Sequence, residues 1–133
     1  MDTTILVEKD IEDGRKLVEA LDRSNFNLVG ALWFYFADSR EWRLLLVSPL
    51  VDTIGPSGCY RRIQSVLKDM SYDLATSFGI PLSRIAVKSP WDSLIRLLKM
   101  AIQTDRRGIS KIRFTRNTIN GVFIEDALIY RLS

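Results

Sequence analysis

The hairpin expected over residues 28–48 constrains the fold more than any other part of the sequence. Two apolar segments, residues 28–37 and 42–48, flank the tetrapeptide Asp-Ser-Arg-Glu, which is typical of two antiparallel strands and their turn. If Ala37 pairs with Trp42, the alternation of side chains makes both faces of the hairpin largely apolar. Such a strand pair must be covered on both sides, either by helices or by a second subunit on one face.

The two faces of this hairpin can be listed from the alternation. One face carries Trp33, Tyr35, Trp42, Leu44 and Leu46, and the other carries Phe34, Phe36, Arg43, Leu45 and Val47. Core packing is the favoured interpretation, because leucines and valines alternate with the aromatic residues. If a second copy covers the first face instead, the interface residues are Trp33, Tyr35 and Trp42.

Three segments have the spacing of amphipathic helices. The first is expected over residues 10–24, with Asp10 as its N-cap and nearby acids complementing the helix dipole rather than binding a metal. The second is expected to begin after Gly58. The third is expected to begin at Ser89, with Pro90 at its first position, and to end at residues 105–108. Its predicted buried stripe is Trp91, Leu94, Ile95, Leu98, Ala101 and Ile102.

The other segments are strand-like. Residues 84–88 are expected to form a short strand, and two extended segments flank Asn120-Gly121, a good hairpin turn. The predicted order is α-β-β-α-β-α-β-β in one domain over residues 1–133, which is an α+β fold. Two crossovers contain helices, so some strands should be parallel, and we expect a mixed five-stranded sheet packed with three amphipathic helices.

Composition removes several kinds of chemistry. The 133 residues include no histidine, which excludes Ser-His-Asp and Cys-His catalysis and histidine-ligated zinc or iron. The single cysteine excludes an internal disulfide and fits a reducing, cytoplasmic location. The N-terminal residues lack the pattern of a signal peptide, and no apolar run is long enough to span a membrane. We expect no cofactor and no metal, and the sequence favours a protein without enzymatic activity.

The segment 47–63 links an expected strand to an expected helix, a layout in which anions often bind. Gly55 and Gly58 do not have the spacing of a phosphate-binding P-loop, a dinucleotide fingerprint or a nucleophile elbow. Cys59 has no base nearby, so we expect an inert, buried thiol. The segment is therefore interpreted as a strand end, a turn and a helix start.

A Ser-Pro pair ends each of two expected strands, at Ser48-Pro49 and at Ser89-Pro90. If these strands are parallel neighbours, both pairs lie at one edge of the sheet, where ligands often bind in α/β proteins. The ligand-edge residues would be Ser48, Asp52, Ser57, Arg61, Ser89 and Asp92. The alternative is that each pair only stops a strand and caps a helix.

Charge is distributed unevenly along the chain. Residues 1–59 carry a net charge of −4, whereas residues 84–116 contain nine basic and two acidic residues, a net charge of +7. The basic segment is either a solvated face, a surface for an acidic protein partner, or a surface for nucleic acid or a phosphate ligand. The nucleic-acid contacts would be Arg106, Arg107, Lys111, Arg113 and Arg116.

Three functions are consistent with these features. The favoured hypothesis is a non-enzymatic protein-interaction module with a protein partner or a homo-oligomeric assembly. The second is a nucleic-acid or phosphate-ligand binder that uses residues 84–116. The third is a small enzyme without histidine, with its site at the Ser48 and Ser89 edge.

Overall fold

A computed structural model of the chain describes residues 4–71 and 78–133. Its elements are α1 (Glu8–Arg23), β1 (Gly30–Phe36), β2 (Glu41–Val47), α2 (Val51–Ser71), the short 3₁₀ helix η1 (Leu82–Arg84), β3 (Ile85–Lys88), α3 (Ser93–Lys99), β4 (Ile112–Ile119) and β5 (Val122–Leu132). The predicted order α-β-β-α-β-α-β-β and the α+β class are confirmed.

The five strands form one mixed sheet in the order β3-β2-β1-β5-β4. β2 and β3 are parallel, with Leu44 opposite Ile85, and the other neighbouring strands are antiparallel. A parallel pair needs a crossover connection, and here the crossover contains α2. The expected mixed five-stranded sheet is therefore confirmed.

The central hairpin has the predicted faces but not the predicted register. Trp42 pairs with Tyr35, two residues before Ala37, the expected partner. Because side chains alternate with a period of two, a shift of two residues leaves every side chain on its predicted face. Trp33 and Trp42 accordingly lie in one apolar cluster, and Phe34 lies in the other.

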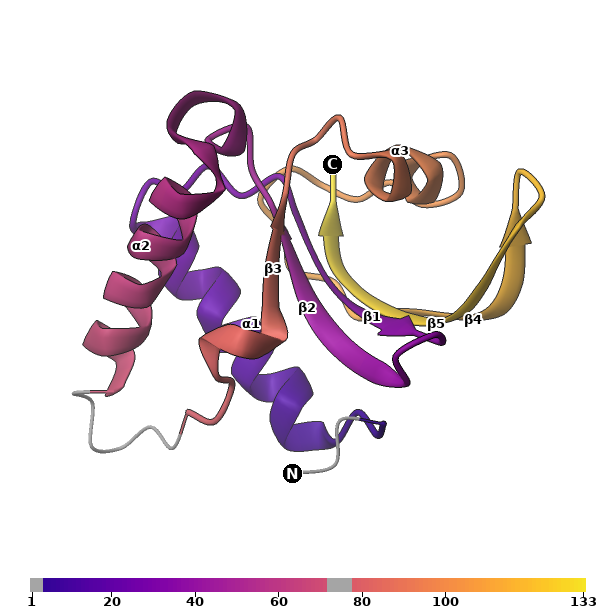
Figure 1. Ribbon diagram of the computed structural model, residues 1–133, viewed down its shortest axis with the longest axis horizontal. Coiled ribbons are helices and arrows are strands. Elements are labelled where there is room, and N and C mark those ends of the chain that lie inside the picture. The colour runs from indigo at the N-terminus through magenta and orange to yellow at the C-terminus, as the bar shows by residue number, and fades with distance from the viewer. Residues whose placement is uncertain (1–3, 72–77) are drawn as a thin grey trace.

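Helices cover both faces of the sheet (Figure 1). Helices α1 and α2 pack on one face, where Leu17 and Ile63 join the cluster that contains Trp33. Helix α3 packs on the other face, where Ile95 joins the cluster that contains Phe34. The three helices on a five-stranded sheet thus agree with the prediction. Within the described ranges, no helix combines the length and apolar character needed to cross a bilayer.

Helix α1 begins two residues before its expected start. Its N-cap is Val7, and the side chain of Asp10 accepts a 3.4 Å hydrogen bond from the backbone N–H of Val7. Asp10 is buried and forms a 3.3 Å ion pair with Arg84, and Asp13 accepts a 2.9 Å hydrogen bond from the backbone of Gly79. Asp10 is therefore the third helical residue and not the expected N-cap, and its carboxylate both accepts from the backbone of Val7 and connects α1 to η1.

The second helix also begins earlier than expected. Gly55, with φ 75° and ψ 168°, separates a first turn from the longer part of α2. Pro56 follows this break and takes the first helical position, where its fixed φ is favourable and its missing N–H has no cost. The expected start after Gly58 is therefore wrong by three residues for this longer part. Leu74, expected in the apolar stripe of this helix, lies outside the described residues.

Helix α3 is shorter than expected and has a different cap. Its N-cap is Asp92, whose side chain accepts hydrogen bonds from the backbone N–H groups of Leu94 and Ile95. The backbone N–H of Asp92 in turn donates to the carbonyl of Ser89 at 3.0 Å. Residues 89–92 therefore form a turn before the helix, and the helix ends at residue 99 rather than at 105–108. Trp91, expected in the buried stripe, is 75% exposed.

The β4–β5 hairpin bends towards α3. Its turn residues Asn120 and Gly121 both have positive φ, at 48° and 81°, as a two-residue type I′ turn requires. Arg116 also has a positive φ of 44°, which interrupts the alternation of β4. Phe114 and Ile119 would otherwise face opposite sides, yet both contact the cluster beneath α3. Figure 1 shows the resulting hairpin rising beside α3.

A buried polar contact fixes the distance between α1 and the sheet. The Tyr130 hydroxyl donates a 2.6 Å hydrogen bond to the carbonyl of Ile11 and accepts a 3.0 Å hydrogen bond from Nε1 of Trp33. Gly14 faces this pair, and a Cβ there would overlap the Tyr130 hydroxyl. Burial is the main cause that raises the pKa of Tyr130 above its ordinary value. The glycine in α1 therefore permits a close approach that any larger residue would prevent.

Candidate functional site

The two Ser-Pro corners lie at the same edge of the sheet. β2 and β3 are parallel neighbours, and the backbone N–H of Ser48 donates to the carbonyl of Lys88 at 3.2 Å. The Ser89 hydroxyl donates a 2.9 Å hydrogen bond to Asp52. The geometric condition for the predicted ligand edge is therefore met.

Three of the six side chains predicted at this edge are bound to the backbone, those of Ser48, Ser89 and Asp92. The buried Ser48 hydroxyl donates to the carbonyl of Phe26 at 2.7 Å and accepts from the N–H of Leu50 at 3.1 Å. The carboxylate of Asp92 caps α3. Ser57 and Arg61 are exposed on α2, and no hydrogen bond or ion pair within residues 4–71 and 78–133 connects them to the corner. These contacts favour a structural role for the edge over a catalytic one.

The five predicted nucleic-acid contacts do not form one surface of free cations. Arg113 forms a bidentate contact with Asp126, at 2.7 and 2.6 Å, and its guanidinium lies 5.4 Å from the ring of Trp42. Lys111 lies 3.8 Å from the carboxylate of Glu8. Arg116, Arg106 and Arg107 are exposed. Two of the five cations are therefore paired with acids, which weakens the case for a continuous basic stripe.

The three aromatic residues expected at an interface belong mainly to the core. Trp33 is 0% and Trp42 is 3% exposed, because α1 and α2 cover this face. Tyr35 is partly exposed and contacts the ring of Trp42, with 5.5 Å between centroids. Two of the three side chains are therefore unavailable to a partner unless the helices move.

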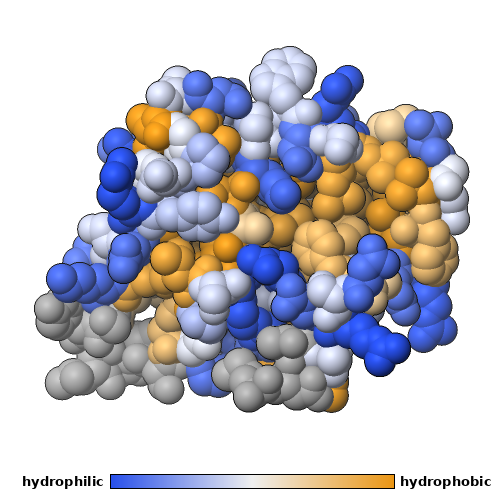
Figure 2. All heavy atoms as spheres, viewed as in Figure 1, coloured by the Kyte–Doolittle hydropathy of each residue, from blue (hydrophilic) through white to orange (hydrophobic). Residues whose placement is uncertain are grey.

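A surface that the sequence did not predict lies on and around α3. We define the α3 surface by the residues that line one hollow of about 370 Å³: Pro90, Trp91, Arg96, Lys99, Met100 and Gln103. Trp91 is 75% and Met100 is 64% exposed. A second hollow of about 320 Å³ lies between α3 and the turn residue Asn120. Figure 2 shows apolar side chains gathered between α3 and the β4–β5 hairpin.

The cations of the α3 surface are free to meet a ligand. The side chains of Arg96 and Lys99 form no hydrogen bond or ion pair with the described residues, and Arg96 lines both hollows. Recognising Asp92 as the N-cap would have placed Trp91 before the helix and outside its buried stripe. That alternative was present in the sequence, because serine and aspartate are both favoured at N-caps.

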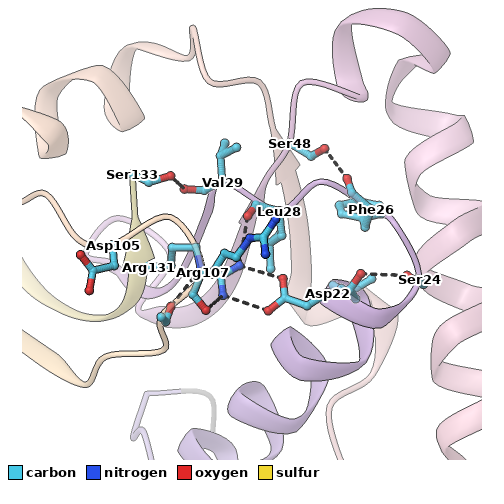
Figure 3. A network of polar contacts seen from close by, with 12 residues as sticks. Asp22, Ser24, Phe26, Leu28, Val29, Ser48, Asp105, Arg107, Arg131 and Ser133 are labelled. Carbon is cyan, nitrogen blue, oxygen red and sulfur yellow. Dashed lines mark hydrogen bonds and ion pairs between the residues drawn. The ribbon is translucent and has the colours of Figure 1, made fainter.

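A second site surrounds the buried side chain of Arg131 (Figure 3). Arg131 forms a bidentate ion pair with Asp22, at 2.8 and 2.9 Å. Its other N–H groups donate to the carbonyls of Leu28 at 3.1 Å, Gly108 at 3.0 Å and Arg107 at 2.9 Å. A guanidinium has five N–H donors, so all of them are used. Arg131 therefore connects the end of α1, the 24–29 loop and the 105–109 loop.

These loops enclose the arginine pocket, a cavity of about 810 Å³. Its lining residues are Asp22, Asn25, Asn27, Leu28, Val29, Arg106, Arg107 and Arg131. The 104–110 segment is held beside β5, because the backbone N–H groups of Thr104 and Ser110 donate to the carbonyls of Leu132 and Tyr130. The sequence contained one signal for this pocket. Arg131 stands in the apolar run 127–133, and a charged residue buried in such a run needs a partner.

Thiol chemistry and metal binding have little support among the described residues. Cys59 is fully buried, and burial is the main cause that raises the pKa of its thiol, while the charge of Arg62 acts in the opposite direction. A raised pKa makes the thiol less reactive. Among residues 4–71 and 78–133, no group of three or more acidic or cysteine side chains is placed to hold a metal ion.

Neither the residues of the α3 surface nor those of the arginine pocket can be matched to a known site by similarity. A comparison with protein-family models, curated proteins and solved structures finds no match for this chain.

Proposed function

We propose that this chain is a non-enzymatic protein-binding module whose α3 surface binds a partner segment that combines apolar side chains with carboxylates. The observation that carries the proposal is the 75% exposure of Trp91 beside the hollow lined by Met100. Large exposed apolar side chains on a folded domain mark interaction surfaces when they are grouped. Trp91 and Met100 are grouped around one hollow, which distinguishes them from isolated exposed residues.

The residue types of the α3 surface support protein binding. Tryptophan, methionine and arginine are enriched in protein interfaces, and tryptophan and arginine are the commonest energetic hot spots. Trp91 is positioned by a turn that leads into a capped helix. A side chain presented by a fixed backbone loses little conformational entropy on binding. The hollow of about 370 Å³ has the size to accept one apolar side chain from a partner.

Charge indicates the chemistry of that partner. Arg96 and Lys99 border the hollow, and the surrounding segment 84–116 has a net charge of +7. Complementary charge raises association rates and disfavours partners of like charge. The preferred partner segment is therefore acidic. A second copy of the chain is a special case, because residues 1–59 have a net charge of −4. The proposal places this binding in the cytoplasm, where Cys59 stays reduced.

Selection from a display library of random peptides, with the chain as bait, tests this function. Enriched peptides should contain apolar residues next to Asp or Glu, and Trp91→Ala should weaken their binding by at least tenfold, about 1.4 kcal/mol. The double variant R96E/K99E should abolish binding. Its control is R61E/R62E, which changes the net charge equally at exposed positions on α2.

Two results would contradict the proposal. One is a set of peptides without acidic enrichment whose binding survives Trp91→Ala. The other is an equal loss of binding in R96E/K99E and R61E/R62E, which would show dependence on net charge alone. Sedimentation velocity over a range of concentrations tests the special case. Self-association that Trp91→Ala abolishes would identify a second copy as the partner.

A further inference from the structure

We propose that the arginine pocket binds a small phosphorylated molecule, with Arg106 and Arg107 as the residues that hold its phosphate group. The site is separate from the α3 surface, since the two share no lining residue. It is also independent of whether the chain binds a protein partner.

The first argument is the supply of free donors. Arg106 and Arg107 are adjacent, exposed and lining the cavity, and neither side chain forms a hydrogen bond or ion pair with the described residues. The same holds for the side-chain amides of Asn25 and Asn27, on the opposite loop. Guanidinium groups bind phosphate oxygens in pairs through parallel N–H donors. The pocket thus brings two such groups and two amides to one cavity.

The second argument is the charge of the lining. Asp22 is the one carboxylate among the lining residues, and both of its oxygens are bound by Arg131. The two charges offset each other, and the remaining charge of the lining comes from Arg106 and Arg107. A phosphate monoester carries between one and two negative charges near neutral pH. Its charge therefore matches the two free guanidinium groups.

The third argument is that the site is built before any ligand arrives. The carbonyls of Arg107 and Gly108 both accept hydrogen bonds from the buried Arg131, so the backbone that carries the free arginines is fixed. Arg131 has no donor left for a ligand, and we therefore assign it as a positioning residue. Leu28 and Val29 add an apolar wall, suited to the organic part of a phosphorylated molecule.

The cavity favours a small ligand over a nucleic-acid strand. Its volume of about 810 Å³ lies within the usual range for small-molecule sites. A strand would need cations that continue beyond the pocket, as in binding grooves that follow a phosphate backbone. The next cations along the chain, Lys111 and Arg113, are instead paired with Glu8 and Asp126.

Isothermal titration of the full chain with inorganic pyrophosphate, at about 50 mM salt, tests the site. We expect saturable binding to one site, which R106A/R107A weakens by at least tenfold. R61A/R62A removes an adjacent, exposed arginine pair on α2 and should change affinity by less than twofold. Urea unfolding of each variant shows whether it is folded. If R106A/R107A is not, the single variants Arg106→Gln and Arg107→Gln replace it.

Two further ligands distinguish the chemistry. Citrate has several carboxylates but no phosphate, and it should bind at least tenfold more weakly than pyrophosphate. A single-stranded oligothymidylate should show no affinity that depends on Arg106 and Arg107. The proposal is overturned by absence of pyrophosphate binding, by equal losses in the two double variants, by equal affinity for citrate, or by tighter binding of the oligonucleotide through these arginines.

Discussion

Replacing Gly14 by alanine tests how closely α1 is packed on the sheet. In an exposed helix this substitution stabilises by about 1 kcal/mol, because alanine has the higher helix propensity. Here the new Cβ would overlap the Tyr130 hydroxyl and lie 2.9 Å from Nε1 of Trp33, and both side chains are buried. Overpacking a core costs about 1–3 kcal/mol. We therefore expect Gly14→Ala to lower the free energy of unfolding, by up to about 2 kcal/mol.

A double-mutant cycle with Tyr130→Phe identifies the responsible atom. Tyr130→Phe alone should cost about 1–3 kcal/mol, because the buried carbonyl of Ile11 and Nε1 of Trp33 lose their partner. Without the hydroxyl, Gly14→Ala should cost about 1 kcal/mol less than in the wild-type chain. Urea unfolding followed by tryptophan fluorescence gives all four free energies. Additivity within about 0.5 kcal/mol, or a stabilising Gly14→Ala, would refute the reasoning.

Four other outcomes are expected. Arg131→Met keeps an unbranched stem but removes five donors, so the free energy of unfolding in urea should fall by about 3–5 kcal/mol; a loss below about 1 kcal/mol contradicts this. Partial burial acts to raise the pKa of Asp126, but hydrogen bonds, chiefly from Arg113, outweigh this effect and lower the pKa below its ordinary value. Its folded-state pKa is thus below its unfolded value, so its contribution to stability is present above about pH 4 and is lost as the pH falls through the folded pKa. Asp126→Asn should make Tm less sensitive to acid, and an unchanged acid profile argues against this. Because Cys59 is fully buried and burial also raises its pKa, its thiol should react with a disulfide reagent roughly 100-fold more slowly in the native chain than in urea; equal rates would show that it is accessible. Trp91→Phe should remove most of the fluorescence that acrylamide quenches, since the other two tryptophans are buried; unchanged quenching would mean that Trp91 is covered.

The fold could be predicted because it depends on periodic patterns. Apolar side chains with a period of two or near 3.6 identify strands and helices without knowledge of their partners. The register of the hairpin at Trp42 could not be fixed in the same way, because shifts by two residues preserve the pattern. The start of α3 was also ambiguous, because two residues could serve as its N-cap. Ser89 and Asp92 are both good N-caps, and the choice between them decides whether Trp91 is buried or exposed.

The candidate sites depend on contacts between distant residues, which no local pattern encodes. Arg106 and Arg107 were predicted to bind an anion from their charge alone. Their cavity, however, forms because Arg131 contacts Asp22, which is 109 residues away in the sequence. Lys111 was grouped with these arginines because it is close in sequence, but its side chain meets Glu8 instead. Sequence therefore identified the charged residues, and tertiary structure decided which of them are free.

The pairing of β1 with β5 affects how the chain is made. β1 is central in the sheet, yet one of its two neighbours comes from the other end of the chain, with Gly30 opposite Leu132. On the ribosome, β1 and β2 can form their hairpin early, but the second edge of β1 stays open until β5 emerges. An open edge of a largely apolar strand can pair with other chains. Nascent or truncated chains that lack β5 should therefore depend on chaperones far more than the completed domain does.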